Sequence, residues 1–127
     1  MTKAEIRKLD ALWAKLVKQK AGGKCEYCLE TRREFKGGPG IWLEAAHIVG
    51  RTYRATRWLL ENGMALCSGC HKAYDEHRPD ELKIRRIVIG EDKYERLCSM
   101  KQVIAKNQDY EKIKKKLEDD YNEAVAV

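Results

Sequence analysis

Hydrophobic residues recur at helical spacing along the first twenty residues of the chain. Thr2 followed three residues later by Glu5 is a capping-box pattern, and Gly22-Gly23 offers a C-terminal stop. The pattern predicts an amphipathic N-terminal helix whose apolar stripe packs in a core and whose lysines form a solvated face. The stripe consists of Ile6, Leu9, Leu12, Trp13, Leu16 and Val17.

The middle of the chain has the shorter apolar runs that are typical of strands. Apolar and other side chains alternate between residues 41 and 46, which predicts a strand from Ile41 to Val49. Asn62-Gly63 is a turn signal, and the apolar run 64–66 after it predicts a second short strand. Residues 71–76 then continue as a helix until Pro79 approaches.

The last third of the chain contains three helical patterns. The first ends at Gly90, and the third leaves Lys112 and Lys114 to Lys116 exposed. Together with the two strands, these patterns predict an α+β fold. The apolar positions are Leu82, Ile87 and Val88 in the first helix, Tyr94, Leu97, Val103 and Ile104 in the second, and Tyr110, Ile113, Leu117 and Tyr121 in the third.

Composition and length narrow the class of protein. A chain of 127 residues with 43% hydrophobic and 36% charged residues fits one globular domain, residues 1–127, with a heavily solvated surface. No apolar run is long enough to span a bilayer, and the first ten residues lack a secretory signal, so we expect a cytoplasmic protein with no membrane partner. The net charge of +6 favours an acidic partner, for which nucleic acid is the commonest candidate.

Four of the five cysteines form two C-x-x-C pairs, Cys25 with Cys28 and Cys67 with Cys70. Two residues between the cysteines let a tight turn point both sulfurs at one ion, and two such pairs complete the tetrahedral S4 shell that Zn²⁺ accepts. The pattern therefore predicts a structural zinc with no open position. A redox pair or an iron–sulfur cluster is the alternative, and Cys98 reads as a small buried hydrophobe.

The three histidines all lie around the second cysteine pair. His47 ends the predicted first strand, and His71 follows Cys70 directly. Asp75 lies four residues after His71, so on a helix both side chains project from one face. That spacing can hold a second divalent cation, and a bare zinc ribbon does not explain this ordered set of residues.

At these residues the sequence resembles the HNH endonuclease family, in the four-cysteine branch found among phage-related and restriction-associated nucleases. The resemblance covers Cys25 to about Pro79. It implies a zinc-braced ββα-metal core (24–79) flanked by an N-terminal helix (1–23) and a C-terminal helical extension (80–127). The motifs that carry it are C25-x-x-C28, A46-H47-I48, R57-W58, E61-N62-G63-M64-A65-L66-C67-x-x-C70-H71 and Y74-D75.

The resemblance implies metal-dependent hydrolysis of DNA phosphodiester bonds. His47 takes the place of the general base that activates water, with its other ring nitrogen held by a backbone carbonyl. Asn62 takes the position that braces the loop carrying the base. His71 and Asp75 take the positions of ligands to a catalytic divalent metal such as Mg²⁺ or Mn²⁺.

One motif position departs from the family pattern. Many members place Asp or His directly before the base as a further metal ligand, and this chain has Ala46. Glu44, His77 or water molecules could complete the metal's coordination shell instead.

The loop after His47 carries three arginines, Arg51, Arg54 and Arg57, which are the candidates for contacts with DNA phosphates. Trp58 reads as a structural partner of Arg57. Two other classes of protein remain open: a non-catalytic zinc module that binds nucleic acid, and a partner-binding protein that uses its C-terminal helices among other phage or DNA-processing proteins. The oligomeric state is open, and a paired cut would require two chains.

Overall fold

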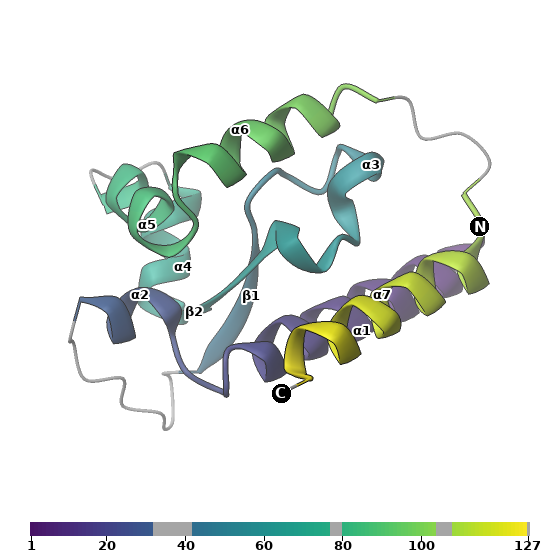
Figure 1. Ribbon diagram of the computed structural model, residues 1–127, viewed down its shortest axis with the longest axis horizontal. Helices are drawn as coiled ribbons and strands as arrows, with labels where there is room; N and C mark the ends of the chain where they lie inside the picture. The colour runs from purple at the N-terminus through teal and green to yellow at the C-terminus, as the bar shows by residue number, and fades with distance from the viewer. Residues whose placement is uncertain (32–41, 77–79, 104–107, 127) are drawn as a thin grey trace.

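A two-stranded antiparallel sheet lies at the centre of the molecule with helices around it (Figure 1). The computed structural model describes residues 1–31, 42–76, 80–103 and 108–126. Strands and helices together confirm the α+β class. In chain order the elements are α1 (Lys3–Lys20), α2 (Glu26–Glu30), β1 (Leu43–His47), α3 (Arg54–Arg57), the 3-10 helix η1 (Leu60–Asn62), β2 (Gly63–Cys67), α4 (Ser68–Asp75), α5 (Asp80–Val88), α6 (Glu91–Met100) and α7 (Tyr110–Val125).

The hairpin formed by β1 and β2 fixes which residues meet at each of its ends. Leu43 pairs with Cys67 at one end, and His47 pairs with Gly63 at the other. The strand predicted for residues 41–49 is therefore shorter than expected: it ends at His47, and Ile41 lies outside the described residues. The second predicted strand is confirmed.

The prediction of a tight turn at Asn62-Gly63 is wrong. The two strands are joined by a long connection that contains α3 and η1, and Gly63 has an extended backbone with φ of −121° as it enters β2. The glycine is needed for another reason, because a Cβ built on it would meet Val17 and would lie 2.9 Å from Cζ2 of Trp13. Helix α1 thus packs directly on the backbone of β2.

Helix α1 confirms the prediction for the N-terminal segment. The Thr2 side chain accepts a hydrogen bond from the Glu5 amide at 3.1 Å, and the Glu5 carboxylate accepts one from the Thr2 amide at 2.8 Å. Gly22 and Gly23 have φ of +69° and +74°, which glycine adopts without strain and which stops the helix.

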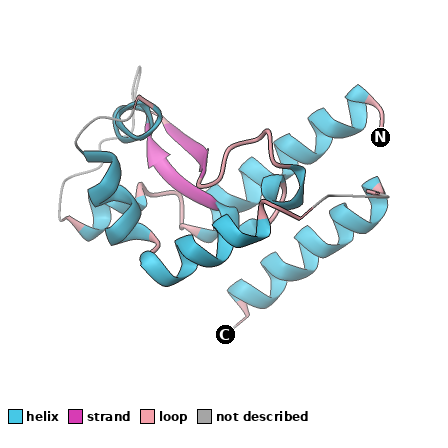
Figure 2. Cartoon of the chain, turned by 90° about the horizontal axis from the view of Figure 1, so that it is seen from above, coloured by secondary structure: helices cyan, strands magenta, loops and turns pink. Residues whose placement is uncertain are grey.

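The hairpin has hydrophobic clusters on both faces. Ala65 faces a cluster that includes Leu9, Trp13 and Leu117, from α1 and α7. Met64 and Leu66 point the other way, into a cluster built with the cysteine pairs and α4 to α6. Figures 1 and 2 show the strands enclosed between these two groups of helices, with α1 and α7 side by side and running in the same direction.

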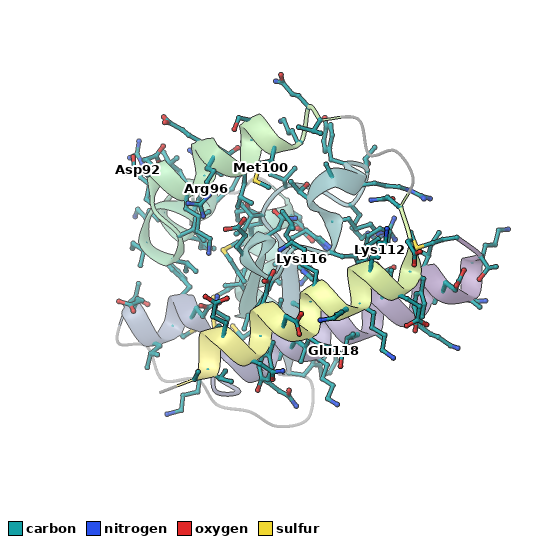
Figure 3. All side chains as sticks on the ribbon, turned by 45° about the vertical axis from the view of Figure 1, so that its right-hand side comes forward. Asp92, Arg96, Met100, Lys112, Lys116 and Glu118 are labelled. Carbon is teal, nitrogen blue, oxygen red and sulfur yellow. The ribbon has the colours of Figure 1, made fainter. Side chains whose placement is uncertain are left out.

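Three helices form in the last third of the chain, as predicted, but Leu82 and Ile87 of α5 are exposed and Ile84 is the buried residue of that helix. Gly90, with φ of +81°, caps the start of α6, and α6 ends at Met100, before Val103. On α7, Lys112, Lys116 and Glu118 are exposed, and Figure 3 shows this charged helix lying along the body of the molecule. No described helix combines the length and the apolar character that crossing a bilayer requires.

Candidate active site and metal centre

The four cysteines of the two C-x-x-C pairs come together at one end of the hairpin. Cys25 caps α2, and its sulfur accepts a hydrogen bond from the Cys28 amide at 3.4 Å. Cys67 ends β2, and Cys70 lies in the first turn of α4. The local turns point each pair of sulfurs at one centre, and the packing of α2 against the sheet brings the pairs together.

The spacing of the sulfurs fits a tetrahedral ion. All four Sγ atoms lie within 4.8 Å of one another, with 3.8 Å between Cys28 and Cys70 and 3.9 Å between Cys28 and Cys67. Sulfurs placed at about 2.3 Å from a tetrahedral zinc are about 3.8 Å apart. Three of the four cysteines are buried, and the fourth is partly buried. The cluster is a metal-binding group whose donors and geometry suit zinc.

Burial and shared hydrogen bonds disfavour the ionisation of two thiols of this cluster. Burial raises the pKa of the Cys28 thiol to about 12, and the hydrogen bond with Cys25 raises the pKa of the Cys70 thiol above its ordinary value. The hydrogen bond from Cys70 in turn lowers the pKa of Cys25 to about 4. Thiolate is the form that binds metal, so a divalent cation and the ionised cysteines stabilise each other.

At the opposite end of the hairpin, His47 is held by a backbone carbonyl. Its Nε2 lies 3.1 Å from the carbonyl oxygen of Arg57. A carbonyl oxygen can only accept, so Nε2 carries the proton and donates it. Burial lowers the pKa of His47 to about 4, and the hydrogen bond to Arg57 opposes this shift only in part. The ring is therefore neutral at pH 7, with the lone pair on Nδ1.

Asn62 braces the segment that follows His47. It is fully buried, and its side chain makes both hydrogen bonds with the backbone of Val49: Oδ1 accepts from the amide at 2.8 Å, and Nδ2 donates to the carbonyl at 3.0 Å. The Ile48 amide also donates to the backbone carbonyl of Asn62 at 2.9 Å. The loop after His47 is thus tied to the start of β2.

His71 on α4 lies between two carboxylates. Its Nδ1 is 3.1 Å from Oε1 of Glu44, and its Nε2 is 3.1 Å from Oδ2 of Asp75. A carboxylate only accepts, so a neutral ring with its proton on Nδ1 presents the Nε2 lone pair beside the Asp75 oxygen. Two lone-pair donors that face each other in this way can bind one cation.

Glu44 therefore contacts the nitrogen of His71 that is farther from Asp75. Its position is that of a carboxylate that orients a histidine ligand. Ala46 is fully buried and offers no donor, and His77 lies outside the described residues. In the described part of the chain, the cysteines form the one group of three or more clustered metal donors. The histidine site supplies two protein donors, which is the pattern of a cation that keeps several water ligands.

A groove of about 520 Å³ connects the two histidines. Arg51 follows β1 and is exposed at the rim of this groove. The lining comes from α1, β1, the loop after β1, and α4: Asp10, Trp13, Ala14, Ala45, His47, Gly50, Arg51, His71 and Asp75.

The three arginines after His47 differ in their surroundings. Arg51 lies in the predicted loop, whereas Arg54 and Arg57 belong to the short helix α3, so the prediction of a loop is wrong for these two. Arg54 is exposed. Arg57 donates through Nε at 3.1 Å and through Nη2 at 2.8 Å to the two oxygens of Asp10. Trp58 is buried, and its Nε1 donates to Asp10 at 2.8 Å. The guanidinium of Arg57 lies over its ring at 5.2 Å, so the two residues are the structural pair that was predicted.

Asp10 lines the groove but does not belong to any motif that the sequence predicts for the site. Burial alone would raise the pKa of this carboxyl, but the hydrogen bonds from Arg57 and Trp58 outweigh it and hold the pKa below its ordinary value. Apart from Glu5, Asp10 is the one acidic residue in α1, and it interrupts the apolar stripe between Leu9 and Trp13. That interruption is a sequence signal of a buried polar contact.

Comparison with known proteins finds a family match for the central part of the chain. The model of the HNH endonuclease family matches residues 25–78, a little under half of the chain. No curated protein and no solved structure matches significantly. The matched segment runs from the first cysteine through the hairpin to the end of α4 and contains both histidines of the groove. Residues 25–78 of the chain are thus similar to the HNH endonuclease family, and the cluster of four cysteines is consistent with its zinc-containing branch.

Proposed function

We propose that this protein is a metal-dependent DNA endonuclease whose active site is the groove between His47 and His71. The observation that supports this proposal is that a neutral imidazole, a two-donor cation site and an exposed arginine line one groove. Hydrolysis of a phosphodiester needs a base for water, a counter-charge for the phosphate, and stabilisation of the leaving oxygen. The groove offers a group for each requirement.

His47 acts as the general base. Its Nδ1 has no hydrogen-bond partner among the residues that the structure describes, and Nε2 is fixed on the Arg57 carbonyl. Nδ1 takes a proton from water as the water oxygen attacks phosphorus, and the bond from phosphorus to the 3′ oxygen breaks. The departing 3′ oxygen takes up a proton from solvent water, which leaves 5′-phosphate and 3′-hydroxyl ends, as is usual in the family.

His71 and Asp75 hold the catalytic cation, and Glu44 orients His71. When bound, Mg²⁺ or Mn²⁺ supplies a Lewis acid that offsets the negative charge of the phosphate and the leaving oxygen. Zinc bound by the four cysteines would have no open position and would serve the fold. Asn62 keeps the base in register by holding the loop behind it.

Arg51 and Arg54 are the best placed of the three arginines to bind the DNA backbone. Both are exposed, and Arg51 is at the rim of the groove. Arg57 is committed to Asp10, so its side chain serves the structure of the site. Contacts between arginine and phosphate are electrostatic and do not distinguish one base sequence from another. DNA binding should therefore weaken steeply as the salt concentration rises.

The test is cleavage of supercoiled plasmid by the zinc-loaded protein with Mg²⁺ or Mn²⁺, with and without EDTA. We expect nicking that needs the added metal and that falls about 10²–10⁴-fold in His47→Ala, the range of general-base catalysis. Zinc content and DNA affinity of the variant should match those of the wild type. Binding without cleavage under every metal would replace the enzyme with a non-catalytic zinc module that binds nucleic acid.

A further inference from the structure

We propose that helix α1, which lies outside the segment that matches the family, is part of the active site because Trp13 and Asp10 position the base. This inference rests on the proposed function and adds two positioning residues to it. The observation that supports it most directly is the contact between α1 and the ring of His47.

Trp13 stacks on His47. The two ring centroids are 3.8 Å apart, and the ring planes differ by 11°. Trp13 is itself fixed, because it is buried and its indole Nε1 donates to the backbone carbonyl of Leu59 at 2.8 Å. A flat ring held in this way leaves the imidazole free to turn only in its own plane, which its hydrogen bond to Arg57 prevents.

Asp10 acts on the same imidazole indirectly, through the residue whose carbonyl accepts the hydrogen bond from His47. The carbonyl that accepts from His47 Nε2 belongs to Arg57, whose side chain is bound through two hydrogen bonds to Asp10. Trp58, the next residue, donates to Asp10 as well. One carboxylate on α1 therefore fixes the end of α3 from which the carbonyl reaches His47.

The packing around Gly63 indicates that this contact is a close one. Gly63 is the strand partner of His47, and its missing side chain leaves the space that Trp13 and Val17 occupy. The indole thus covers the end of the hairpin, over His47 and over its partner on β2. Ordinary core packing accounts for the burial of Trp13, but it does not require the parallel stack on a ring that also lines the groove.

The consequence is a base that is oriented before substrate arrives. Pre-positioning matters because misplacement of a catalytic group by about 1 Å can cost 10²-fold in rate. Loss of the indole should therefore lower kcat, with little change in KM, since α1 supplies no donor to the metal pair.

The experiment compares three variants of the full zinc-loaded chain. Trp13→Leu removes the stack and keeps an apolar side chain, Trp13→Phe keeps a flat ring, and Leu16→Ala is the control. Leu16 is buried on the same helix, and it does not line the groove. Each variant is measured for kcat, KM and thermal stability, and ¹⁵N NMR of the histidine ring reports which nitrogen of His47 carries the proton.

We expect kcat of Trp13→Leu to fall about 10²-fold, with recovery in Trp13→Phe, and Leu16→Ala to lose stability without loss of kcat. The NMR signals should report a proton fixed on Nε2 in the wild type and a mixture of tautomers in Trp13→Leu. Equal losses of kcat in Trp13→Leu and Leu16→Ala, or an unchanged tautomer, would reduce α1 to a packing element.

Asp10→Asn keeps the inference testable where Trp13→Leu does not fold. It retains one acceptor for Arg57 and Trp58 and removes the charge, and we expect a smaller loss of kcat and the same mixture of tautomers. An Asp10→Asn variant with wild-type kcat and a fixed tautomer would contradict the role of Asp10 as a positioning residue. The NMR result also separates the two proposals, because it does not depend on cleavage. A wild-type protein that does not cleave DNA but keeps the proton fixed on Nε2 would contradict the nuclease function and would still support the positioning of His47 by α1.

Discussion

The two ends of the β hairpin carry different kinds of chemistry. At the end where Leu43 pairs with Cys67, four identical sulfur donors converge and are largely buried. At the end where His47 pairs with Gly63, the imidazole of His47 lines a groove that it shares with the nitrogen and oxygen donors of His71 and Asp75. Five residues of strand, about 16 Å at the usual rise, run from one end to the other.

The difference shows how a small domain can keep a group that stabilises the fold apart from groups that are open to a substrate. A closed shell of four protein donors leaves no position for water, so its ion contributes to folding alone. A pair of protein donors leaves most of a cation's coordination positions to water and phosphate. The hairpin connects the two sites, so a zinc ion bound by the four cysteines would also hold the strand that carries the proposed base, His47.

The largest expected effect is at the cysteine end. Cys70→Ser should lose zinc and most of the ordered fold, because zinc binding to such sites is worth about 10 kcal/mol or more of coupled folding free energy. Cys98→Ser is the matched control, since Cys98 is partly buried and lies outside the cluster. Zinc content and circular dichroism measure the result. A Cys70→Ser protein that keeps its fold without zinc would contradict a structural role for the cluster.

A smaller effect is expected when the carboxylate that contacts His71 Nδ1 is replaced. Glu44→Gln keeps the shape but weakens the hold on Nδ1, and outer partners of this kind are worth about 10–100-fold in metal affinity or activity. We expect a higher Mn²⁺ concentration at half-maximal cleavage, with zinc content unchanged. If the variant lost zinc instead, the proposed cation site at His71 and the cysteine cluster would not be independent.

Removal of one arginine at the groove should have a still smaller effect. Arg51→Ala should weaken DNA binding at every sequence alike and lower the slope of log affinity against log salt by about 1. Lys115→Ala removes the same charge from α7, where Lys115 is paired with Asp119 at 3.0 Å, and serves as the control. Equal salt slopes in both variants would remove Arg51 from the DNA interface.

The smallest expected change is in the titration of His47. Burial disfavours the charged ring and lowers its pKa to about 4, so the ring stays neutral as the pH falls through the ordinary value of 6.5. Proton NMR of the ring between pH 7.5 and 5.5 should show His47 nearly constant. Half-protonation near pH 6.5 would mean that the ring is solvated and that the stack on Trp13 is open.

Local patterns explain which parts of the molecule could be predicted from the sequence. Helices α1 and α7 follow from periodicity, and the cysteine cluster follows from spacing. The contact of Asp10 with Arg57 joins residues that are 47 positions apart, which no local pattern encodes. Asn62-Gly63 predicts a turn because Asn-Gly usually marks one, whereas here the absence of a side chain on Gly63 leaves room for Trp13. The sequence offers Glu44 as a metal ligand, and only the tertiary structure places it against Nδ1 of His71.

The most direct test of the account is a crystal structure of the zinc-loaded protein soaked in Mn²⁺, with anomalous scattering recorded for both elements. The account predicts zinc at the four cysteines and manganese between His71 and Asp75, on the groove that His47 faces. Manganese at the cysteines alone, or a His47 ring turned out of the groove in the soaked crystal, would contradict it.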